Sequence, residues 1–390
     1  MNDKELTDPT DLVGRRIEGK YQVEQVVDRT DHSIVFRATH LIWKRNVAIK
    51  VFMQGSPLFV PGSLLEAEAR DAIVAGFVRE GALLNELSET CSAVCQARDI
   101  GSLRTPAGRW MPYIVLEWLE GDSLDTLLSR EREIGAPPRT IREVVRLLGP
   151  IADALACAHA RGVAHCDVTP GNIILLRTGN RQCKLLDFGI AKKVRDAMPS
   201  WSSIVELAFA SDYGASEEFD PTYGETGPWT DVFALALVVV EMVCGRDALQ
   251  GHEVGTLGRR SCDGDRRPTP RTLGIKVNDE VERVLRRALE VNPAHRFADV
   301  RAFWNEFASA VKTEDEGQPI PVALHPDRLN PAAPLGAELP CARRVRGHRR
   351  WLSTALVSAI AIAAGLGIPN HVGGSAHHRG ARVPVLALAR

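Results

Sequence analysis

The sequence lacks a paired cysteine framework. Its eight cysteines stand at the scattered positions 91, 95, 157, 166, 183, 244, 262 and 341. Cys91 and Cys95 do not have the spacing of a zinc knuckle, and the sequence has no His or Cys pair that could supply the other two zinc ligands. Disulfide-stapled domains and zinc modules are therefore excluded, and reduced thiols in a cytosolic domain are the simpler interpretation.

The chain also has no excess of charge of one sign and no apolar leader. Its 390 residues carry a formal net charge of −1. We expect no nucleic-acid partner, because binding to phosphates requires an excess of basic residues. Residues 1–16 are polar and charged, so no secretory signal peptide opens the chain. The composition that remains, 45% hydrophobic and 25% charged, predicts a packed core.

The pattern of apolar residues changes along the chain. Residues 1–20 are predicted to be a polar leader, short alternating segments typical of strands follow, and helical periodicity dominates beyond Leu119. Strands first and helices after, without β-α-β alternation, predict an α+β domain over residues 21–311. The predicted strands are 21–27, 34–38, 46–52, 111–118, 173–176 and 183–186, and the predicted helices are 64–87, 141–161, 231–244, 277–289 and 300–311.

The last part of the chain resembles a tethered tail. Residues 312–350 have linker composition, with five prolines between 319 and 334 and then arginines at 343, 344, 346, 349 and 350. Residues 351–368 carry no charge and would span about 27 Å as a helix, which predicts a single transmembrane helix with a short extracytoplasmic tail at 369–390. The preceding arginines would hold their side in the cytoplasm. The alternatives are a helix packed on the main domain and a loosely ordered tail.

Three short stretches carry most of the functional information: Val47–Lys50, His165–Asn172 and Asp187–Gly189. They supply a lysine, then an aspartate and an asparagine, then a second aspartate. Phosphoryl transfer needs such groups, because it depends on positioning and on charge placed around phosphate oxygens. Each stretch alone is a weak signal, but three in this order and at this separation are specific.

On these stretches, residues 21 to about 311 resemble the eukaryotic-like (Hanks-type) serine/threonine protein kinases of bacteria. Ala215–Glu217 is similar to the family's Ala-Pro-Glu, Asp231–Ala236 to its Asp-x-Tyr-x-Leu-Gly, and Asn292–Arg296 to its terminal arginine motif. The resemblance implies the bilobal protein kinase fold, with a small β-rich N-lobe containing one αC helix and a larger helical C-lobe. It also implies that Arg296, the terminal arginine, pairs with Glu217 of the Ala-Pro-Glu-like segment.

The resemblance implies ATP and Mg²⁺ (or Mn²⁺) as the bound groups. Lys50 would bind the α- and β-phosphates, and Asp187 and Asn172 would hold the metal. Asp167 would orient the substrate hydroxyl and accept its proton. Thr169 stands where the family has a lysine, and it keeps a hydroxyl but no charge at the site.

The family's ATP-binding lysine is held by a glutamate of the αC helix. Glu80 fits the register of that helix best, and Glu86 and Glu66 are the alternatives. The resemblance further places adenine among six residues: Val35, Ala48, Leu116, Glu117, Leu119 and Ile174. The backbone of Glu117 and Leu119 would bond to the base, and Leu116 would close the back of its pocket.

Three departures from the family pattern bear on mechanism. The segment Asp28–Val35 has none of the glycines of Gly-x-Gly-x-x-Gly-x-Val, so side chains crowd the phosphate loop and we expect weaker ATP binding. Cys166 replaces the arginine that grips an activation-loop phosphate, which favours activity independent of that phosphate. Phe209–Tyr213 departs from Gly-Thr-Pro-x-Tyr, so the bracing of the catalytic aspartate is altered.

The resulting prediction is a serine/threonine kinase with protein substrates, single-pass in the cell inner membrane, its kinase domain cytoplasmic. Two copies could pair for autophosphorylation. The alternative is a catalytically weak pseudokinase that binds nucleotide or acts as a scaffold, which the lost glycines, Cys166 and Thr169 favour. Retention of all four polar groups favours the enzyme. A small-molecule kinase fits poorly, because that class lacks the activation segment and the buried helix motif.

Overall fold

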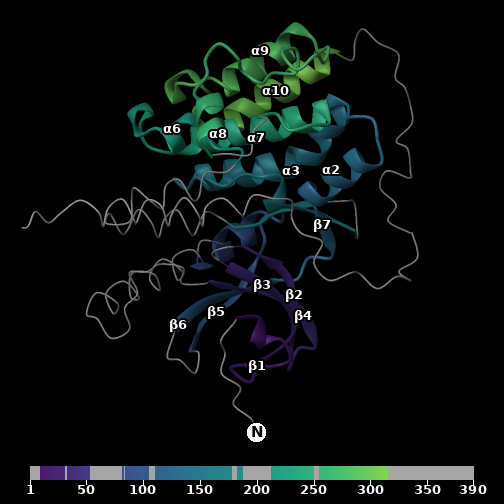
Figure 1. The fold of residues 1–390 in the computed structure, drawn as a ribbon, viewed down its shortest axis with the longest axis vertical. Helices are drawn as coiled ribbons and strands as arrows, with labels where there is room; N and C mark the ends of the chain where they lie inside the picture. Colours follow the sequence, from purple (N-terminus) through teal and green to yellow (C-terminus); the bar gives the residue numbers. More distant parts are fainter. Residues whose placement is uncertain are drawn as a thin grey trace, which may run out of the picture. The chain divides into compact units, whose positions relative to one another are not determined.

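The chain is described from a computed structural model (Figure 1). The described residues are 9–30, 33–52, 81–82, 84–104, 110–177, 182–187, 212–249 and 254–314. The chain divides into two compact units, residues 1–326 and 327–390, and every described residue belongs to the first. The span predicted at 351–368 and the tail after it lie outside the described residues. Among the helices in the described ranges, none has the length and apolar character that crossing a bilayer requires.

The part of the described chain from Arg16 to Glu117 contains a six-stranded antiparallel sheet. Its strands, in spatial order, are β1 (Arg16–Ile17), β2 (Tyr21–Arg29), β3 (Ser33–His40), β4 (Arg45–Phe52), β6 (Trp110–Glu117) and β5 (Ala97–Arg104). Alternate residues of the central strands are buried, as a half-buried strand requires. On β3 and β4 these are Ile34, Phe36, Ala38, Val47, Ile49 and Val51, which belong to one apolar cluster.

The predicted polar leader is in part structural. Pro9–Leu12 forms a 3₁₀ turn, and β1 pairs with the start of β2. Leu12 and Ile17 are buried in the core of the sheet. Residues 9–20 are therefore part of the domain, and the prediction of a separate leader over this range is corrected. A strand of two residues is too short to produce an apolar alternation in the sequence.

A smaller sheet follows, with strand order β7 (Gly121–Ser123), β8 (Ile173–Leu176) and β9 (Cys183–Leu185). Strands β8 and β9 pair antiparallel, as the sequence predicted. A Cβ atom on Gly121 would lie 2.4 Å from the carbonyl oxygen of Leu175, so no larger residue fits between the paired strands. The glycine thus lets β7 approach β8 closely.

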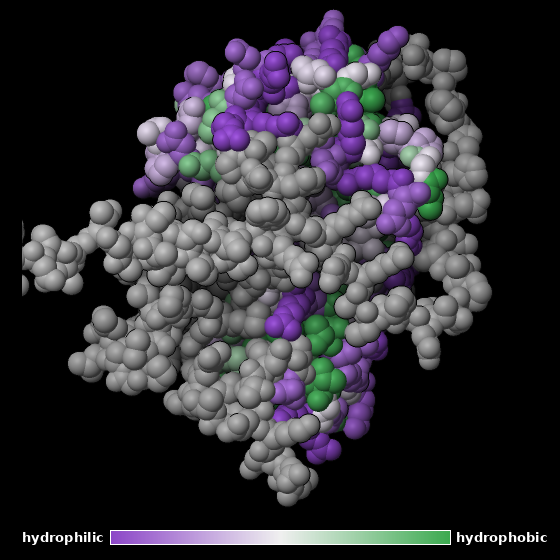
Figure 2. Space-filling view, in the orientation of Figure 1, coloured by the Kyte–Doolittle hydropathy of each residue, from purple (hydrophilic) through white to green (hydrophobic). Residues whose placement is uncertain are grey.

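The remaining described residues are mostly helical and gather apart from the large sheet (Figure 1). The helices are α2 (Leu124–Glu133), α3 (Ile141–His159), α6 (Ser216–Phe219), α7 (Pro228–Cys244), α8 (Val254–Ser261), α9 (Asp279–Ala288) and α10 (Val300–Glu314). Residues 84–90 are also helical. In Figure 2, polar residues cover most of the visible described surface of this helical part. The order of strands and helices agrees with the predicted α+β class.

Helix α7 lies at the centre of the helical part. Residues 230–244 are all buried, and the helix contacts α3, α9 and α10. The almost continuous apolar run therefore predicted its burial correctly. Gly245 ends the helix in the left-handed conformation, with φ of 67°, which a glycine adopts without strain. Helix α3 begins with a capping box in which Thr140 and Glu143 bond to each other's backbone N–H groups.

Candidate active site

The loop from His165 to Asn172 is fastened to the buried helix α7. The backbone N–H groups of His165 and Cys166 donate to the two carboxylate oxygens of Asp231, each over 2.7 Å. Cys166 has a φ of 59°, in the left-handed region that a residue with a side chain seldom adopts. The paired hydrogen bonds hold the peptide in this strained shape, so Asp231 determines the path of the loop.

Asp231 has a further donor on α3. The Nε2 atom of His159 lies 2.7 Å from Oδ2 of Asp231, while the backbone N–H of Val300 donates to Nδ1 of His159 over 3.3 Å. Since Nδ1 accepts, Nε2 is the nitrogen that carries the proton toward the carboxylate. Helices α3, α7 and α10 are joined in this way beneath the loop.

Asp167 and Asn172 lie side by side within this loop. The Nδ2 group of Asn172 donates to Oδ2 of Asp167 over 2.9 Å and to its backbone carbonyl over 2.8 Å. Pro170–Asn172 forms a 3₁₀ turn that brings the asparagine back toward the aspartate. The backbone N–H of Asp167 donates to Nδ1 of His165 over 3.2 Å, which fixes its peptide.

The electrostatic setting of Asp167 combines opposing effects. Desolvation by its neighbours raises the pKa of the carboxyl, whereas His165, the Asn172 amide and the Lys50 ammonium oppose the rise. Asp167 as a residue nevertheless remains exposed, so contact with water limits the desolvation. A carboxylate that is accessible and held by an amide donor can meet a hydroxyl group in the cleft.

Lys50 of β4 meets Asp187, two residues beyond β9. The Nζ atom of Lys50 lies 2.7 Å from Oδ2 of Asp187, and the two side chains are 16% and 20% exposed. Asp187 has a φ of 44°, and Nε2 of His165 hydrogen-bonds the carbonyl of Leu186 over 2.7 Å. The amine of Lys50 therefore contacts one of the two predicted carboxylates, Asp187, and its charge also acts on Asp167. The large sheet, the loop from His165 to Asn172 and the end of β9 supply these polar groups, and the region between them is the candidate cleft.

The partner glutamate predicted for Lys50 lies outside the described residues. Glu80 and the alternative Glu66 belong to the range 53–80, of which the structure describes nothing. The other alternative, Glu86, is exposed, and its carboxylate accepts from Nε of Arg161 over 3.2 Å. Glu86 therefore pairs with Arg161, just after the end of α3.

The residues predicted around adenine lie on facing elements. Strands β4 and β6 pair Ala48 with Leu116 and Val47 with Glu117, which places these positions on neighbouring strands. Val35 of β3 pairs with Lys50 of β4. Leu116 is buried, and Ala48 and Leu119 are half-buried against the main apolar cluster. Ile174 lies on β8. Five of the six residues therefore lie on strands of the two sheets, and their contact with adenine stays a prediction.

The glycine-free segment joins β2 to β3, and its two described ends are bonded to each other. Pairing continues to Arg29 opposite Ile34, and Thr30 donates its N–H to the carbonyl of Ser33 over 2.8 Å. The Thr30 hydroxyl also accepts from the N–H of Ser33 over 3.0 Å. Hydroxyl groups thus satisfy the backbone where glycines are absent. Residues 31 and 32 lie outside the described residues.

A buried ion pair joins two segments of the helical part. Arg296 reaches both carboxylate oxygens of Glu217, each over 2.9 Å, and both side chains are fully buried. Thr230 donates to Oε1 of the same glutamate over 2.7 Å. Nη2 of Arg296 also lies 2.9 Å from the Ser216 hydroxyl oxygen. The predicted contact between the terminal arginine and the glutamate is present.

Sequence reasoning missed a second buried acid on α7. Glu241 accepts from the hydroxyl of Tyr213 and from the guanidinium of Arg132. Burial raises the pKa of the Glu241 carboxyl, although the Tyr213 hydroxyl and Arg132 oppose that rise. The one acidic residue in the apolar run after Asp231 was the available signal, because a buried carboxylate requires partners. This network ties the start of the described segment at 212 to α2 and α7.

The polar groups of the cleft fit a nucleotide with a divalent metal. Asp and Asn oxygens are the hard ligands that Mg²⁺ prefers, and Lys50 adds a fixed cation beside Asp187. Across the described ranges, no three His, Cys, Asp or Glu side chains converge as a metal cage. A metal at Asp187 and Asn172 would therefore take its other ligands from phosphate and water. Manganese satisfies the same donor chemistry.

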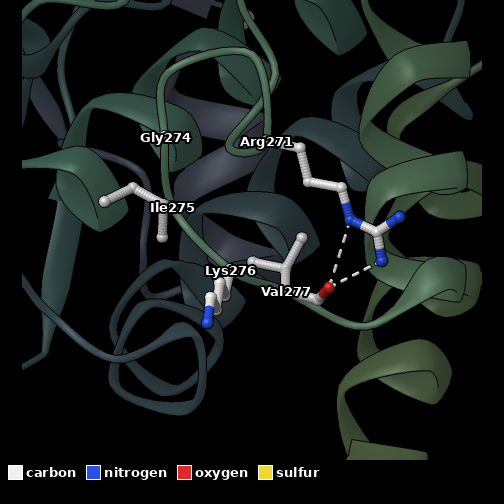
Figure 3. Close-up of a pocket in the computed structure, with 5 residues that line it drawn as sticks. All are labelled: Arg271, Gly274, Ile275, Lys276 and Val277. Atoms are coloured by element: carbon white, nitrogen blue, oxygen red, sulfur yellow. Dashed lines mark hydrogen bonds between the residues drawn. The ribbon is translucent and has the colours of Figure 1, made fainter.

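Two cavities are lined by described residues, and one of them borders Glu117, a residue predicted to bind the nucleotide. One of about 400 Å³ precedes α9 and is lined by residues 271 and 274–277, with Arg271 donating to the carbonyl of Val277 (Figure 3). Another, of about 830 Å³, lies on the large sheet and includes Trp43, Arg45, Arg98 and Trp118 in its lining. Neither includes Lys50, Asp167 or Asp187.

The fold and the cleft define a two-lobed phosphotransferase, and comparison with known proteins gives the family. A model of the protein kinase domain matches residues 21–308. The chain therefore belongs to the protein kinase family, and the resemblance inferred from its motifs is confirmed.

The curated relatives are bacterial serine/threonine-protein kinases. The chain is 28% identical to pkn3 of Myxococcus xanthus over 311 residues, which are 78% of this chain and 52% of that protein. It is 28% identical to PknA of Mycobacterium tuberculosis over 333 residues, which are 85% and 68% of the two proteins. The chain thus spans about half the length of the first relative, and the prediction of a serine/threonine protein kinase is confirmed at the level of the family.

Solved structures support the fold. The kinase domain of Mycobacterium tuberculosis PknI has a TM-score of 0.51 at 23% identity, covering 76% of this chain and 98% of that chain. The apo form of PpkA-294 has a TM-score of 0.56 at 20% identity, with coverage of 76% and 98%. The bilobal α+β kinase fold predicted from the sequence is confirmed.

Cys166 gives a test of regulation. The residue is half-buried within the strained loop and offers no cation to an activation-loop phosphate. We expect the transfer rate of the purified chain to change by less than about twofold after phosphatase treatment, because the arginine that senses such a phosphate is absent. A radiolabel assay before and after treatment measures this. Complete loss of activity would contradict the expectation.

Proposed function

We propose that the chain transfers the γ-phosphoryl group of ATP to serine or threonine hydroxyls of protein substrates. The single observation that carries this proposal is the meeting of Lys50 and Asp187 over 2.7 Å in the cleft that also holds the bonded pair Asp167 and Asn172. A scaffold has no chemical use for all four groups together. An enzyme that neutralises and aligns phosphates needs each of them.

The proposed roles follow from the positions of these groups. Lys50 binds the α- and β-phosphates from β4, and Asp187 and Asn172 hold the metal. The metal, when bound, supplies positive charge to the phosphate oxygens. Asp167 accepts a hydrogen bond from the substrate hydroxyl and takes its proton as the hydroxyl oxygen bonds to the γ-phosphorus, while the bond from that phosphorus to the bridging oxygen of ATP breaks and ADP leaves. Thr169 lies two residues beyond, half-buried, where its hydroxyl borders the site.

A pseudokinase that binds nucleotide with little turnover is the second candidate. The observation that favours it is the pair of hydrogen bonds between Thr30 and Ser33, which stand in a segment that lacks the glycines of the family. The two candidates differ in one measurement, the transfer of labelled phosphate from ATP to protein by the full chain with Mg²⁺ or Mn²⁺. Transfer that is lost in the Asp167→Asn variant supports the enzyme, and nucleotide binding without transfer supports the pseudokinase.

We further propose that two copies pair for autophosphorylation. The same assay addresses this, because the inactive Asp167→Asn chain can serve as the acceptor for the unmutated chain. Label on the acceptor, at a rate that rises with total concentration, supports transfer between copies. Label confined to the unmutated chain would oppose it.

Tethering to the cell inner membrane, with the kinase domain in the cytoplasm, is also a proposal. It rests on the eighteen uncharged residues at 351–368 and on the arginines before them. The full chain should stay in the membrane fraction after carbonate extraction, and the double variant Ala361→Asp with Ile362→Asp should move to the soluble fraction. Release of the unmutated chain by carbonate would count against the tether.

A further inference from the structure

The carboxylate of Glu117, at the end of β6, is held by two donors from separate parts of the chain. The backbone N–H of Gln96 donates to its Oε1 atom over 2.9 Å. The ammonium group of Lys184 on β9 contacts the same oxygen. The Lys184 and Glu117 side chains are only 16% and 18% exposed, so this pair is screened less than a surface ion pair.

The backbone of Glu117 is fixed as well. Its N–H donates to the carbonyl of Gln96 over 2.9 Å, while Val47 of β4 pairs with it on the other side. The N–H and the carboxylate of one residue are therefore both fastened to the same neighbour. Such double attachment leaves the peptide of Glu117 little freedom to rotate.

Strand β9, which carries Lys184, is itself bonded to the segment before β5. The N–H of Leu185 donates to the carbonyl of Ala93 over 2.7 Å, and the N–H of Cys95 donates to the carbonyl of Leu185 over 2.9 Å. Val94 and Leu185 form a parallel bridge. Three residues after Lys184 comes Asp187, which contacts Lys50. The segment from Lys184 to Asp187 therefore contacts both Glu117 and Lys50.

We propose that Lys184 is a positioning residue for the adenine nucleotide. It holds the carboxylate of Glu117 and so keeps the adjoining backbone in the orientation that receives the base, and it thereby sets affinity for ATP more than the rate of transfer. Without Lys184, the half-buried carboxylate loses its only cation among the contacts described and seeks water by turning outward. The proposal rests on the proposed function, since it concerns the same nucleotide site.

Binding of a fluorescent ATP analogue to the full chain tests the role directly. Lys184→Gln should raise the dissociation constant about tenfold, since a charge-assisted hydrogen bond is lost. In the transfer assay, KM for ATP should rise by the same factor, with kcat within about twofold. Lys184→Arg, which keeps the charge, should recover most of the affinity.

A matched control lies on the neighbouring strand edge. Arg177 pairs with Asp122 over 2.7 Å, with a side chain 46% exposed, so Arg177→Gln should leave the dissociation constant unchanged. If Lys184→Gln binds the analogue as tightly as the unmutated chain, the proposal is wrong. It is equally wrong if affinity, kcat and melting temperature all fall together, because that pattern indicates a merely structural role.

A second variant keeps the test decisive if Lys184→Gln does not fold. Glu117→Gln retains the shape of the side chain and weakens the same pair, so its affinity loss should match that of Lys184→Gln, and the double variant should lose no more than either alone. Additive losses would overturn the proposal. If the unmutated chain binds the analogue but transfers no phosphate, the proposed function fails. The dissociation constants of the unmutated and Lys184→Gln chains still decide whether Lys184 positions the nucleotide.

Discussion

Replacing Asp167 with asparagine lowers the rate of phosphoryl transfer by about 10²–10⁴-fold, because the amide cannot accept the proton of the substrate hydroxyl. The substitution keeps the size of the side chain, and the backbone bond to His165 does not involve the carboxylate. Affinity for nucleotide should therefore stay within about twofold. The rate is measured with labelled ATP and a protein acceptor, and the affinity with the fluorescent analogue.

A control separates chemistry from disturbance of the loop. Asn172→Ala removes the donor to Oδ2 of Asp167 without removing the carboxylate, and it also removes a predicted metal ligand. Its activity should fall, and raised Mg²⁺ should restore part of it, whereas no metal concentration should restore Asp167→Asn. Recovery of Asp167→Asn by metal, or a rate within tenfold of the unmutated chain, would refute the role assigned to Asp167.

Replacing Arg296 with methionine lowers the free energy of unfolding by about 3–5 kcal/mol, because it leaves the fully buried carboxylate of Glu217 without its cation. The hydroxyl of Thr230 still donates to that carboxylate, but a neutral donor does not replace a bidentate guanidinium. Urea denaturation followed by tryptophan fluorescence gives the midpoint and the slope from which the change is obtained.

An exposed ion pair serves as the control for this prediction. Arg283 pairs with Glu280 one turn away on α9, and both side chains are more than half exposed. Arg283→Gln should change the free energy of unfolding by no more than about 0.5 kcal/mol. Equal effects of the two substitutions would mean that the buried pair contributes no more than a surface pair, against the prediction.

The sequence predicted the site better than it predicted the elements around it. Lys50, Asp167 and Asp187 were found because a fixed chemical task requires those residue types at characteristic spacings. The contact between Lys184 and Glu117 was not found. Lys184 and Glu117 are 67 positions apart, and nothing in a single sequence marks two distant charges as neighbours.

Some elements were too short or too polar for a periodic pattern to show. Strand β1 has two residues, and helix α2 carries alternating charges in the segment after Leu124. Strand β5 contains charged residues and a glycine at 101, where a Cβ atom would lie 2.2 Å from the hydroxyl of Tyr113. In each case packing against the rest of the domain, rather than local preference, makes the element form.

The attachment of the loop from His165 to Asn172 to Asp231 determines which part of the domain positions Asp167. The loop that carries Asp167 is bonded through the carboxylate of Asp231 to helix α7, whose residues 230–244 are all buried. The position of Asp167 therefore depends on the packing of α7, whereas the position of Lys50 depends on the sheet.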